Sequence, residues 1–254
     1  MTEANEISMY ANRTFLVTGA SSGIGHAVTT ALLSRSAKVI GVSRREPELT
    51  PTEMHDFDSE NFQFLGCDLS DFESLSNSLE PEIRRLRKEK SHPLDGVVLC
   101  HGYGDFGAVE QFSNERISLL IDTNLTSHIM ICRLVLPVLK TVGAGDLIFI
   151  GSESSLKGGK KGAVYCATKF GLRGFAQSLR QECATSNVKV SIVNPGMVDT
   201  GFFDDLDFAP GESQDNQLHA ETVAKAVMAI FDMPSGSVVD EINLSPIKTV
   251  IRNK

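Results

Sequence analysis

The chain has 254 residues, 41% of them apolar, which is typical of one large globular domain and excludes a disordered chain. Its net charge of −8 argues against a nucleic-acid-binding protein, because nucleic-acid partners need a basic face. The five cysteines include no C-x-x-C pair, so we expect reduced thiols and no metal site.

The N-terminal residues predict a loose arm ahead of a single catalytic domain. Residues 1–12 are polar and acidic and lack the apolar core of a signal peptide, and no run approaches the about 18 apolar residues that cross a bilayer. We therefore expect a cytoplasmic protein with no membrane partner. Residues 13–254 contain no internal repeat or linker, which predicts one domain.

A glycine-rich turn joins the first predicted strand to the first predicted helix. Residues 14–18 predict a buried strand and residues 27–33 a helix, and the turn between them has the spacing G-x-x-x-G-x-G. Such glycines let backbone N–H groups approach a pyrophosphate, and the helix N-terminus adds a favourable dipole. We therefore predict a dinucleotide site rather than a turn that is merely tight. Its expected contacts are Gly19, Ser21, Ser22, Gly23, Ile24 and Gly25.

The end of the second predicted strand indicates which dinucleotide binds. An NAD enzyme usually offers a carboxylate to the ribose 2′-hydroxyl at this point. Here residues 39–42 are followed by Ser43 and Arg44, so there is no acid, and a guanidinium can pair with a 2′-phosphate. We predict NADP(H) as the cofactor, with contacts at Ser43 and Arg44. The alternative is that Arg44 simply faces solvent.

The third and fourth predicted strands also end in residues that carry polar groups. Residues 62–66 lead to Asp68 and Leu69. Asp68 either binds the adenine amino group of the cofactor or caps the following helix. The fourth strand, residues 96–99, leads to His101. A lone histidine near a cleft is more often a packing or hydrogen-bonding residue, so we assign it no catalytic role.

A long helix is predicted over residues 115–139, and Asn124 lies inside it. Asparagine is a mediocre helix former, so its position needs a reason. One interpretation is an exposed surface residue. The functional hypothesis is an amide that locally disturbs the helix and holds an ordered water.

Three side chains after the fifth predicted strand carry the expected chemistry. Ser152 follows residues 145–150, where open α/β sheets place their ligands, with residues 153–155 as alternative contacts. Tyr165 and Lys169 are four residues apart, so a helix places both on one face. A lysine ammonium beside a phenol favours the phenolate, so we expect the pKa of Tyr165 to fall from about 10 toward the working pH. Such a phenol is a competent general acid or base for an alcohol or carbonyl oxygen.

The residues after the sixth predicted strand, 188–193, are expected to cover the cofactor and the substrate. Residues 194–200 predict a turn over the nicotinamide, with Thr200 near its amide or the phosphates. Residues 201–219 predict a substrate lid. Side chains near this turn suggest a partly apolar pocket that tolerates an acidic group: Met197, Phe202, Phe203, Lys157, Lys160 and Lys161.

A helix over residues 222–231 and a strand over residues 238–244 complete the predicted pattern. Strands alternate with helices along the whole chain. This alternation predicts the α/β class, with a doubly wound, mainly parallel, seven-stranded sheet of Rossmann type and helices on both faces.

The chain resembles the short-chain dehydrogenase/reductase family, in its short single-domain branch, from Thr18 to about Leu244. The motifs that match in order and spacing are Thr18-Gly19-x-x-x-Gly23-x-Gly25, Asn124, Ser152, Tyr165-x-x-x-Lys169 and Pro195-Gly196. One motif departs from the family pattern. The family usually has Asn-Ala-Gly after the fourth strand, where this chain has Cys100-His101-Gly102. We expect His101 to fill part of the role of the missing asparagine.

The resemblance implies a catalytic tetrad. Tyr165 would transfer the proton, and Ser152 would hold the substrate oxygen. Lys169 would lower the pKa of Tyr165 and bind the nicotinamide ribose, while Asn124 would position a water that links Lys169 to solvent. Family members commonly form homodimers or homotetramers through two long helices, here near residues 113–140 and 165–186. Further cofactor contacts are expected at Asp68, Leu69, Gly102, Tyr165, Lys169, Pro195, Gly196, Val198 and Thr200.

We therefore hypothesise an NADP(H)-dependent oxidoreductase that interconverts a carbonyl and a secondary alcohol by hydride transfer, with Tyr165 as general acid and base. The alternative is a non-catalytic NADP-binding sensor or scaffold on the same fold, which has no need of an intact tetrad. A sugar-nucleotide epimerase or dehydratase of the family's extended branch is disfavoured. Only about 50 residues follow Thr200, too few for a second substrate domain.

Overall fold

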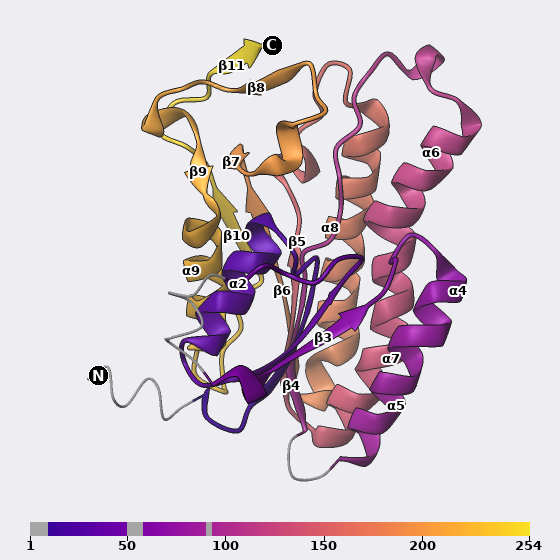
Figure 1. The fold of residues 1–254 in the computed structure, drawn as a ribbon, viewed down its shortest axis with the longest axis vertical. Helices are drawn as coiled ribbons and strands as arrows, with labels where there is room; N and C mark the ends of the chain where they lie inside the picture. The colour runs from indigo at the N-terminus through magenta and orange to yellow at the C-terminus, as the bar shows by residue number, and fades with distance from the viewer. Residues whose placement is uncertain (1–9, 50–57, 90–92) are drawn as a thin grey trace.

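The computed structural model describes residues 10–49, 58–89 and 93–254, and a seven-stranded sheet forms its centre (Figure 1). All neighbouring strands of this sheet are parallel, in the order β10-β6-β5-β4-β1-β2-β3. The order reverses between β1 and β4, and open sheets bind ligands at the carboxyl ends of the strands beside such a switch point. The predicted doubly wound sheet is confirmed. Its strands are β1 Thr14–Thr18, β2 Lys38–Ser43, β3 Phe62–Gly66, β4 Leu94–Leu99, β5 Gly145–Ile150, β6 Val188–Pro195 and β10 Glu241–Leu244.

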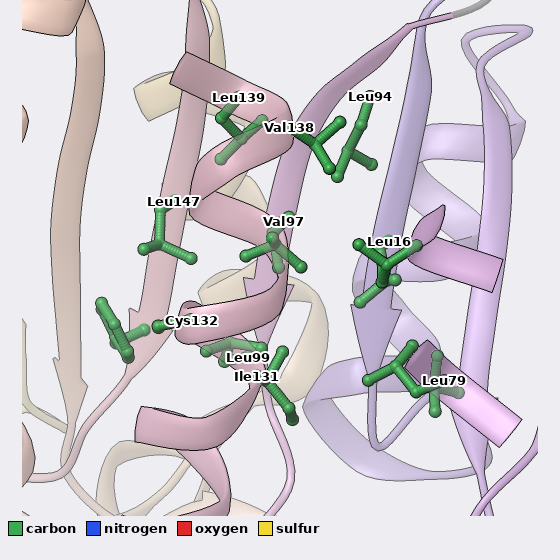
Figure 2. Packing of buried hydrophobic residues seen from close by; sticks show 14 of the residues in the cluster. Leu16, Leu79, Leu94, Val97, Leu99, Ile131, Cys132, Val138, Leu139 and Leu147 are labelled. Carbon is green, nitrogen blue, oxygen red and sulfur yellow. The ribbon is translucent and has the colours of Figure 1, made fainter. Parts of the chain in front are cut away.

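Helices cover both faces of the sheet, and each face has its own apolar layer. The helices α2 (Gly23–Leu33) and α9 (Ala220–Phe231) pack on one face. On the other face lie α5 (Glu80–Lys88), α7 (Ser127–Val142) and α8 (Ala163–Cys183). Figure 2 shows part of this second layer, where leucine and valine side chains of β1, β4 and β5 meet α7. Burial on both faces explains why the central strands are continuously apolar.

A π-turn interrupts the long helix that was expected around Asn124. The helix α6 (Asn114–Ile121) passes into a wider turn, Asp122–Thr126, and continues as α7. The prediction that Asn124 locally disturbs the helix is therefore confirmed, and π-turns of this kind are frequent at functional sites. The whole run Asn114–Val142 is long and apolar enough to cross a membrane by length and composition alone. However, side chains of this run such as Ile131 pack into the apolar layer against the sheet, as the side chains of a core helix do.

A second helical segment after β3 is also divided. It begins with α4 (Phe72–Ser74), passes through the π-turn Leu75–Leu79 and continues as α5. Asp71 caps its start, because its carboxylate accepts a hydrogen bond from the backbone N–H of Glu73. The alternative that Asp68 caps this helix is therefore wrong.

Two small strand pairs lie outside the main sheet, in the upper part of Figure 1. The strand β7 (Val198–Asp199) pairs in parallel with β9 (Leu218–His219). The strand β8 (Phe208–Pro210) pairs antiparallel with β11 (Ile251–Asn253). The ammonium of Lys254 also donates hydrogen bonds to the carbonyls of Phe203 and Asp204. The segment 201–219 is therefore tied to the C-terminal residues by main-chain pairing.

The predicted N-terminal arm is shorter than residues 1–12. Residues 1–9 lie outside the described part of the chain, but Tyr10 is fully buried and its hydroxyl donates a 2.6 Å hydrogen bond to Asp232. The Tyr10 ring lies 5.9 Å from the ring of Phe15. Its apolar body packs with β1 while its hydroxyl finds a partner beyond α9, so Tyr10 belongs to the domain.

Candidate active site

Ser152 and Tyr165 meet just beyond the carboxyl end of β5. Ser152 follows that strand by two residues and caps the short 3₁₀ turn η5 (Glu153–Ser155), accepting a 3.1 Å hydrogen bond from the N–H of Ser154. Tyr165 lies in the first turn of α8 and is only 5% exposed. The Ser152 hydroxyl lies near the phenol of Tyr165, close enough to lower its pKa. An oxygen atom of a substrate placed here can contact both hydroxyl groups.

Lys169 lies one turn further along α8 and is 5% exposed. Its ammonium donates a 3.2 Å hydrogen bond to the carbonyl of Ile150 and lies 5.9 Å from the centre of the Tyr165 ring. Gly102 lies against the same ammonium, because an added Cβ there would be 3.7 Å from it and 3.1 Å from the amide oxygen of Asn124. The structure therefore brings Tyr165, Lys169, Gly102 and Asn124 into one region.

Asn124 is fully buried, and its amide is bound at both ends. The amide oxygen accepts a 3.0 Å hydrogen bond from the N–H of Tyr103, and the amide nitrogen donates a 2.8 Å bond to the Tyr103 carbonyl. The side chain thus holds the backbone that follows β4, which an exposed surface asparagine would not do. Its role in holding an ordered water stays a prediction.

The predicted lowering of the Tyr165 pKa is wrong for this structure. Burial raises the pKa of Tyr165 to about 12, and the nearby Ser152 hydroxyl only partly opposes that rise. Burial also lowers the pKa of Lys169 to about 8. The physical reason is that desolvation disfavours the charged form of both groups, while the ammonium is directed to Ile150 rather than to the phenol oxygen. The spacing of residues along a helix predicts which of them share a face, but it does not predict how far that face is buried from solvent.

His101 is a buried residue that connects the loop after β4 to β1 and α7 through hydrogen bonds. One ring nitrogen lies 2.7 Å from the Thr18 hydroxyl at the end of β1, and the other lies 2.8 Å from the Ser127 hydroxyl in α7. The ring stacks on that of His128 at 3.8 Å. Burial and the charge of Lys169 lower the pKa of His101 to about 3, so the ring is neutral. These bonds support the expectation that His101 takes over part of the missing asparagine's role.

We expect His101→Ala to lower the free energy of unfolding by about 1–3 kcal/mol, because it leaves two buried hydroxyl groups without their partner. Urea titration measures this, with His219→Ala as the control because His219 is exposed. Neutral His101, with its pKa near 3 instead of 6.5, contributes stability above pH 6.5 that is lost as the pH falls toward 3. The variant should lack that pH dependence. An equal loss of unfolding free energy in both variants would contradict a stabilising role for the hydrogen bonds of His101.

The glycine-rich turn is as tight as predicted and opens directly into α2. Gly19 and Gly23 have φ of +67° and +54°, in the left-handed region that favours glycine. A Cβ on Gly25 would overlap the carbonyl oxygen of Gly19. Ser22 is the N-cap residue of α2, but its hydroxyl accepts no hydrogen bond from the first turn of the helix. The backbone N–H groups at the start of α2 are therefore not occupied by that hydroxyl. A Cβ on Gly23 would lie 3.2 Å from Thr200, so the turn and Thr200 are neighbours.

The ends of β2 and β3 lie beside this turn. Ser43 is buried and its hydroxyl donates to the Arg45 carbonyl, whereas Arg44 is exposed. The Asp68 carboxylate accepts hydrogen bonds from the backbone N–H and the hydroxyl of Ser70. Burial alone would raise the pKa of Asp68, but these two hydrogen bonds and the charge of Arg44 together hold it below its usual range. The charge of Arg44 therefore reaches Asp68, without an ion pair between these two described residues. Leu69 packs its side chain into the apolar layer, which leaves only its backbone for a nucleotide.

The turn after β6 connects the site to the segment 201–219. The N–H of Gly196 donates to the Leu244 carbonyl at 2.7 Å, which fixes the residue after Pro195. Val198 is buried and contributes its backbone to β7. The hydroxyl of Thr200 accepts a hydrogen bond from Phe202 and so caps the turn Gly201–Phe203.

Aromatic side chains lie around Tyr165, and one of them, Phe106, was not singled out from the sequence. The ring of Phe106, from the loop after β4, lies 5.0 Å from the ring of Tyr165, and the ring of Phe202, which was expected near the pocket, lies 6.0 Å from it. Phe208 contacts Phe106 at 5.0 Å. A Cβ on Gly104 would overlap the Phe202 ring, so Phe202 rests directly on that backbone. Phe106 was missed because a loop residue has no periodic pattern to reveal it.

The charged residues near the site differ from those expected. The lysines of the loop before α8 are exposed, and the ammonium of Lys161 lies 3.8 Å from Asp207. Glu153, beside Ser152, is half-buried and stands against the turn after β6, where a Cβ on Gly196 would lie 3.3 Å from its Oε2 atom. The charge that acts on the Tyr165 phenol is therefore that of the Glu153 carboxylate and not that of a lysine of this loop.

Comparisons with known proteins agree with this architecture. The sequence profile of the family described as short chain dehydrogenase matches residues 13–209. An uncharacterized oxidoreductase of Staphylococcus epidermidis is 31% identical, over 91% of this chain and 96% of that protein. One of Staphylococcus aureus is 28% identical over the same shares.

Solved structures show the same fold. The closed form of serine dehydrogenase complexed with NADP+ superposes with a TM-score of 0.74 at 24% identity, covering 91% of this chain and 94% of the other. An alcohol dehydrogenase from the archaeon Thermococcus sibiricus, complexed with 5-hydroxy-NADP, gives a TM-score of 0.76 at 24% identity, covering 92% and 97%. At such identities the likeness establishes the arrangement of strands and helices.

Proposed function

This chain belongs to the short chain dehydrogenase family, a family of oxidoreductases, and from that premise we propose that it is an NADP(H)-dependent enzyme that interconverts a carbonyl and a secondary alcohol. The observation that carries the proposal is the meeting of the Ser152 hydroxyl and the Tyr165 phenol beyond the carboxyl end of β5. Lys169 lies one turn away, and the loop after β4 joins this pair to Gly102.

The residues of the glycine-rich turn fit a dinucleotide. Gly19, Gly23 and Gly25 leave no side chain between the backbone and a pyrophosphate, and α2 begins where the phosphates would lie. Arg44, which is exposed directly after β2, would pair with a 2′-phosphate. Bound NADPH supplies a hydride to the carbonyl carbon of the substrate.

The chain's own residues handle the substrate oxygen and the proton. In carbonyl reduction, Ser152 donates a hydrogen bond to the oxygen as negative charge develops there. Tyr165 is protonated at neutral pH, since burial moves its pKa further above neutrality, and in this form it can give that oxygen a proton. Lys169, with its pKa lowered to about 8, would bind the ribose hydroxyls, and Asn124 keeps the neighbouring backbone in place.

Residues 201–219 are proposed to form the substrate lid, since Phe202 and Phe208 come from this segment and reach Tyr165 or its neighbour Phe106. We also propose a homodimer or homotetramer through α6, α7 and α8. Leu119, Ile129 and Phe170, one from each of these helices, are between 40% and 48% exposed, an unusual share for large apolar side chains. A cytoplasmic location stays a prediction.

The activity is tested by following NADPH oxidation over a panel of ketones, keto-acyl thioesters, sugars and steroids. Turnover of a ketone or aldehyde supports the enzyme. Tight NADPH binding without turnover of any member would favour the non-catalytic sensor, the alternative that the sequence also allows.

We expect Arg44→Ala to weaken NADPH binding about tenfold or more and to leave NADH binding nearly unchanged, because a charge-assisted hydrogen bond contributes about 1.5–3 kcal/mol. Fluorescence titration with each nucleotide measures both affinities. Arg45→Ala is the matched control, since Arg45 is the exposed neighbour. Tighter binding of NADH than of NADPH by the unaltered protein, or an equal effect of both substitutions, would show that Arg44 does not read the phosphate.

A further inference from the structure

Glu153 is the acidic side chain nearest in sequence to the reacting pair. It follows Ser152 directly, within η5, and it is half-buried. Its Oε2 atom lies 3.3 Å from the position of a Cβ on Gly196, so the carboxylate lies against the turn after β6. Its charge also acts on the phenol of Tyr165, so a substrate whose oxygen binds that phenol lies within the electrostatic reach of Glu153.

The carboxylate of Glu153 lacks a hydrogen-bond partner within the described parts of the chain. Burial raises its pKa, and the charge of Lys157 opposes that rise only from a distance, since Lys157 is exposed. The Glu153 oxygens are not among the fully buried polar atoms that lack a partner in the described residues, so they keep access to the solvent. The site thus presents a partly desolvated negative group that is free to accept a hydrogen bond from a ligand.

The aromatic rings near Tyr165 are compatible with a cation beside the reacting oxygen. Phe106 and Phe202 both lie within 6.0 Å of the Tyr165 ring, and the faces of aromatic rings attract cations. The Glu153 charge also adds to the effect of burial in raising the pKa of Tyr165. A positive group next to Glu153 would cancel that contribution and make the phenol a better base for alcohol oxidation.

We infer that the substrate carries a protonated amino group next to its reacting carbon, as in an amino ketone or amino alcohol, and that Glu153 binds this ammonium. The inference rests on the proposed function and names the substrate class for the same site. The lysines of the neighbouring loop are exposed to solvent, so we do not expect them to make the site prefer a substrate that carries a carboxylate.

Two ketones of the same shape test the inference. The amine is 1-(dimethylamino)propan-2-one, studied in mildly acidic buffer where it is protonated, and its neutral isostere is 4-methylpentan-2-one; acetoacetate is the anionic comparison. We expect kcat/KM for the amine to exceed that for the isostere about tenfold or more, with acetoacetate slowest. Glu153→Gln should reduce that ratio about tenfold, whereas Lys160→Gln, in the same loop and exposed, should keep it. A ratio unchanged in Glu153→Gln, or a preference for acetoacetate, would overturn the inference.

A second measurement separates this inference from the proposed function. Calorimetric titration of the amine into the protein saturated with NADP+ needs no turnover. If no ketone is reduced, the proposed function fails, but loss of amine binding in Glu153→Gln still supports the role of Glu153. Equal binding in the two proteins overturns it. With a neutral secondary alcohol, Glu153→Gln should also shift the rise of kcat with pH to lower pH, because the pKa of Tyr165 falls when a neighbouring negative charge is removed.

Discussion

Tyr165→Phe is expected to lower kcat for carbonyl reduction by about three orders of magnitude and to leave NADPH binding within about twofold. The phenol lies near the Ser152 hydroxyl, so it is the group that we expect to protonate an oxygen held there. Phenylalanine keeps the ring, which contacts Phe106 and Phe202, so the packing of the site survives. Steady-state assays and NADPH titration of the same preparation measure the two quantities.

Tyr103→Phe is the matched control for this loss. Tyr103 lies on the loop after β4 and uses its backbone, not its hydroxyl, to bind Asn124. Its phenylalanine variant should therefore retain most of the activity. Substantial residual turnover in Tyr165→Phe would remove the proton-transfer role, and an equal loss in Tyr103→Phe would point to a general disturbance of the site.

Gly25→Ala is expected to lower the free energy of unfolding by about 3 kcal/mol, the upper end for overpacking, and to weaken NADPH binding about a hundredfold. The added methyl group would overlap the carbonyl oxygen of Gly19, which is backbone and cannot rotate away. The turn would have to open, and the N–H groups it presents would move with it. Urea unfolding and NADPH titration measure the two effects.

Gly174→Ala provides the opposite result in the same chain. Gly174 is exposed within α8, and a Cβ there would meet nothing within 4 Å. Alanine should therefore stabilise the helix by about 0.5–1 kcal/mol with no effect on NADPH. If both substitutions were neutral, the close approach of Gly25 to Gly19 would not be a real constraint on the turn.

The strands and the order of site residues were predictable because both depend on local pattern. Apolar runs such as residues 14–18 and 145–150 are typical of central parallel strands, and ligand-contacting residues follow at the carboxyl ends of such strands. The helix disturbance at Asn124 was predictable because asparagine is a poor choice for a helix interior. Each of these inferences needs only a residue and its near neighbours in sequence.

The parts that were not predictable depend on residues far apart in the chain. The pKa of Tyr165 depends on burial to which the distant Phe106 and Phe202 contribute, so spacing to Lys169 alone pointed in the wrong direction. The strand β11 was missed because it is three residues long and exposed, and it exists only through its pairing with β8. The burial of Tyr10 likewise depends on Asp232, which is 222 residues away.

The contact between Phe202 and the bare backbone at Gly104 makes these two positions a single steric unit. The two residues are complementary there: a side chain at position 104 would displace the Phe202 ring, and a smaller residue at position 202 would leave a void above Gly104. A variant designed to change the substrate range at this place would therefore have to alter positions 104 and 202 together, so that a larger side chain at one position is matched by a smaller one at the other.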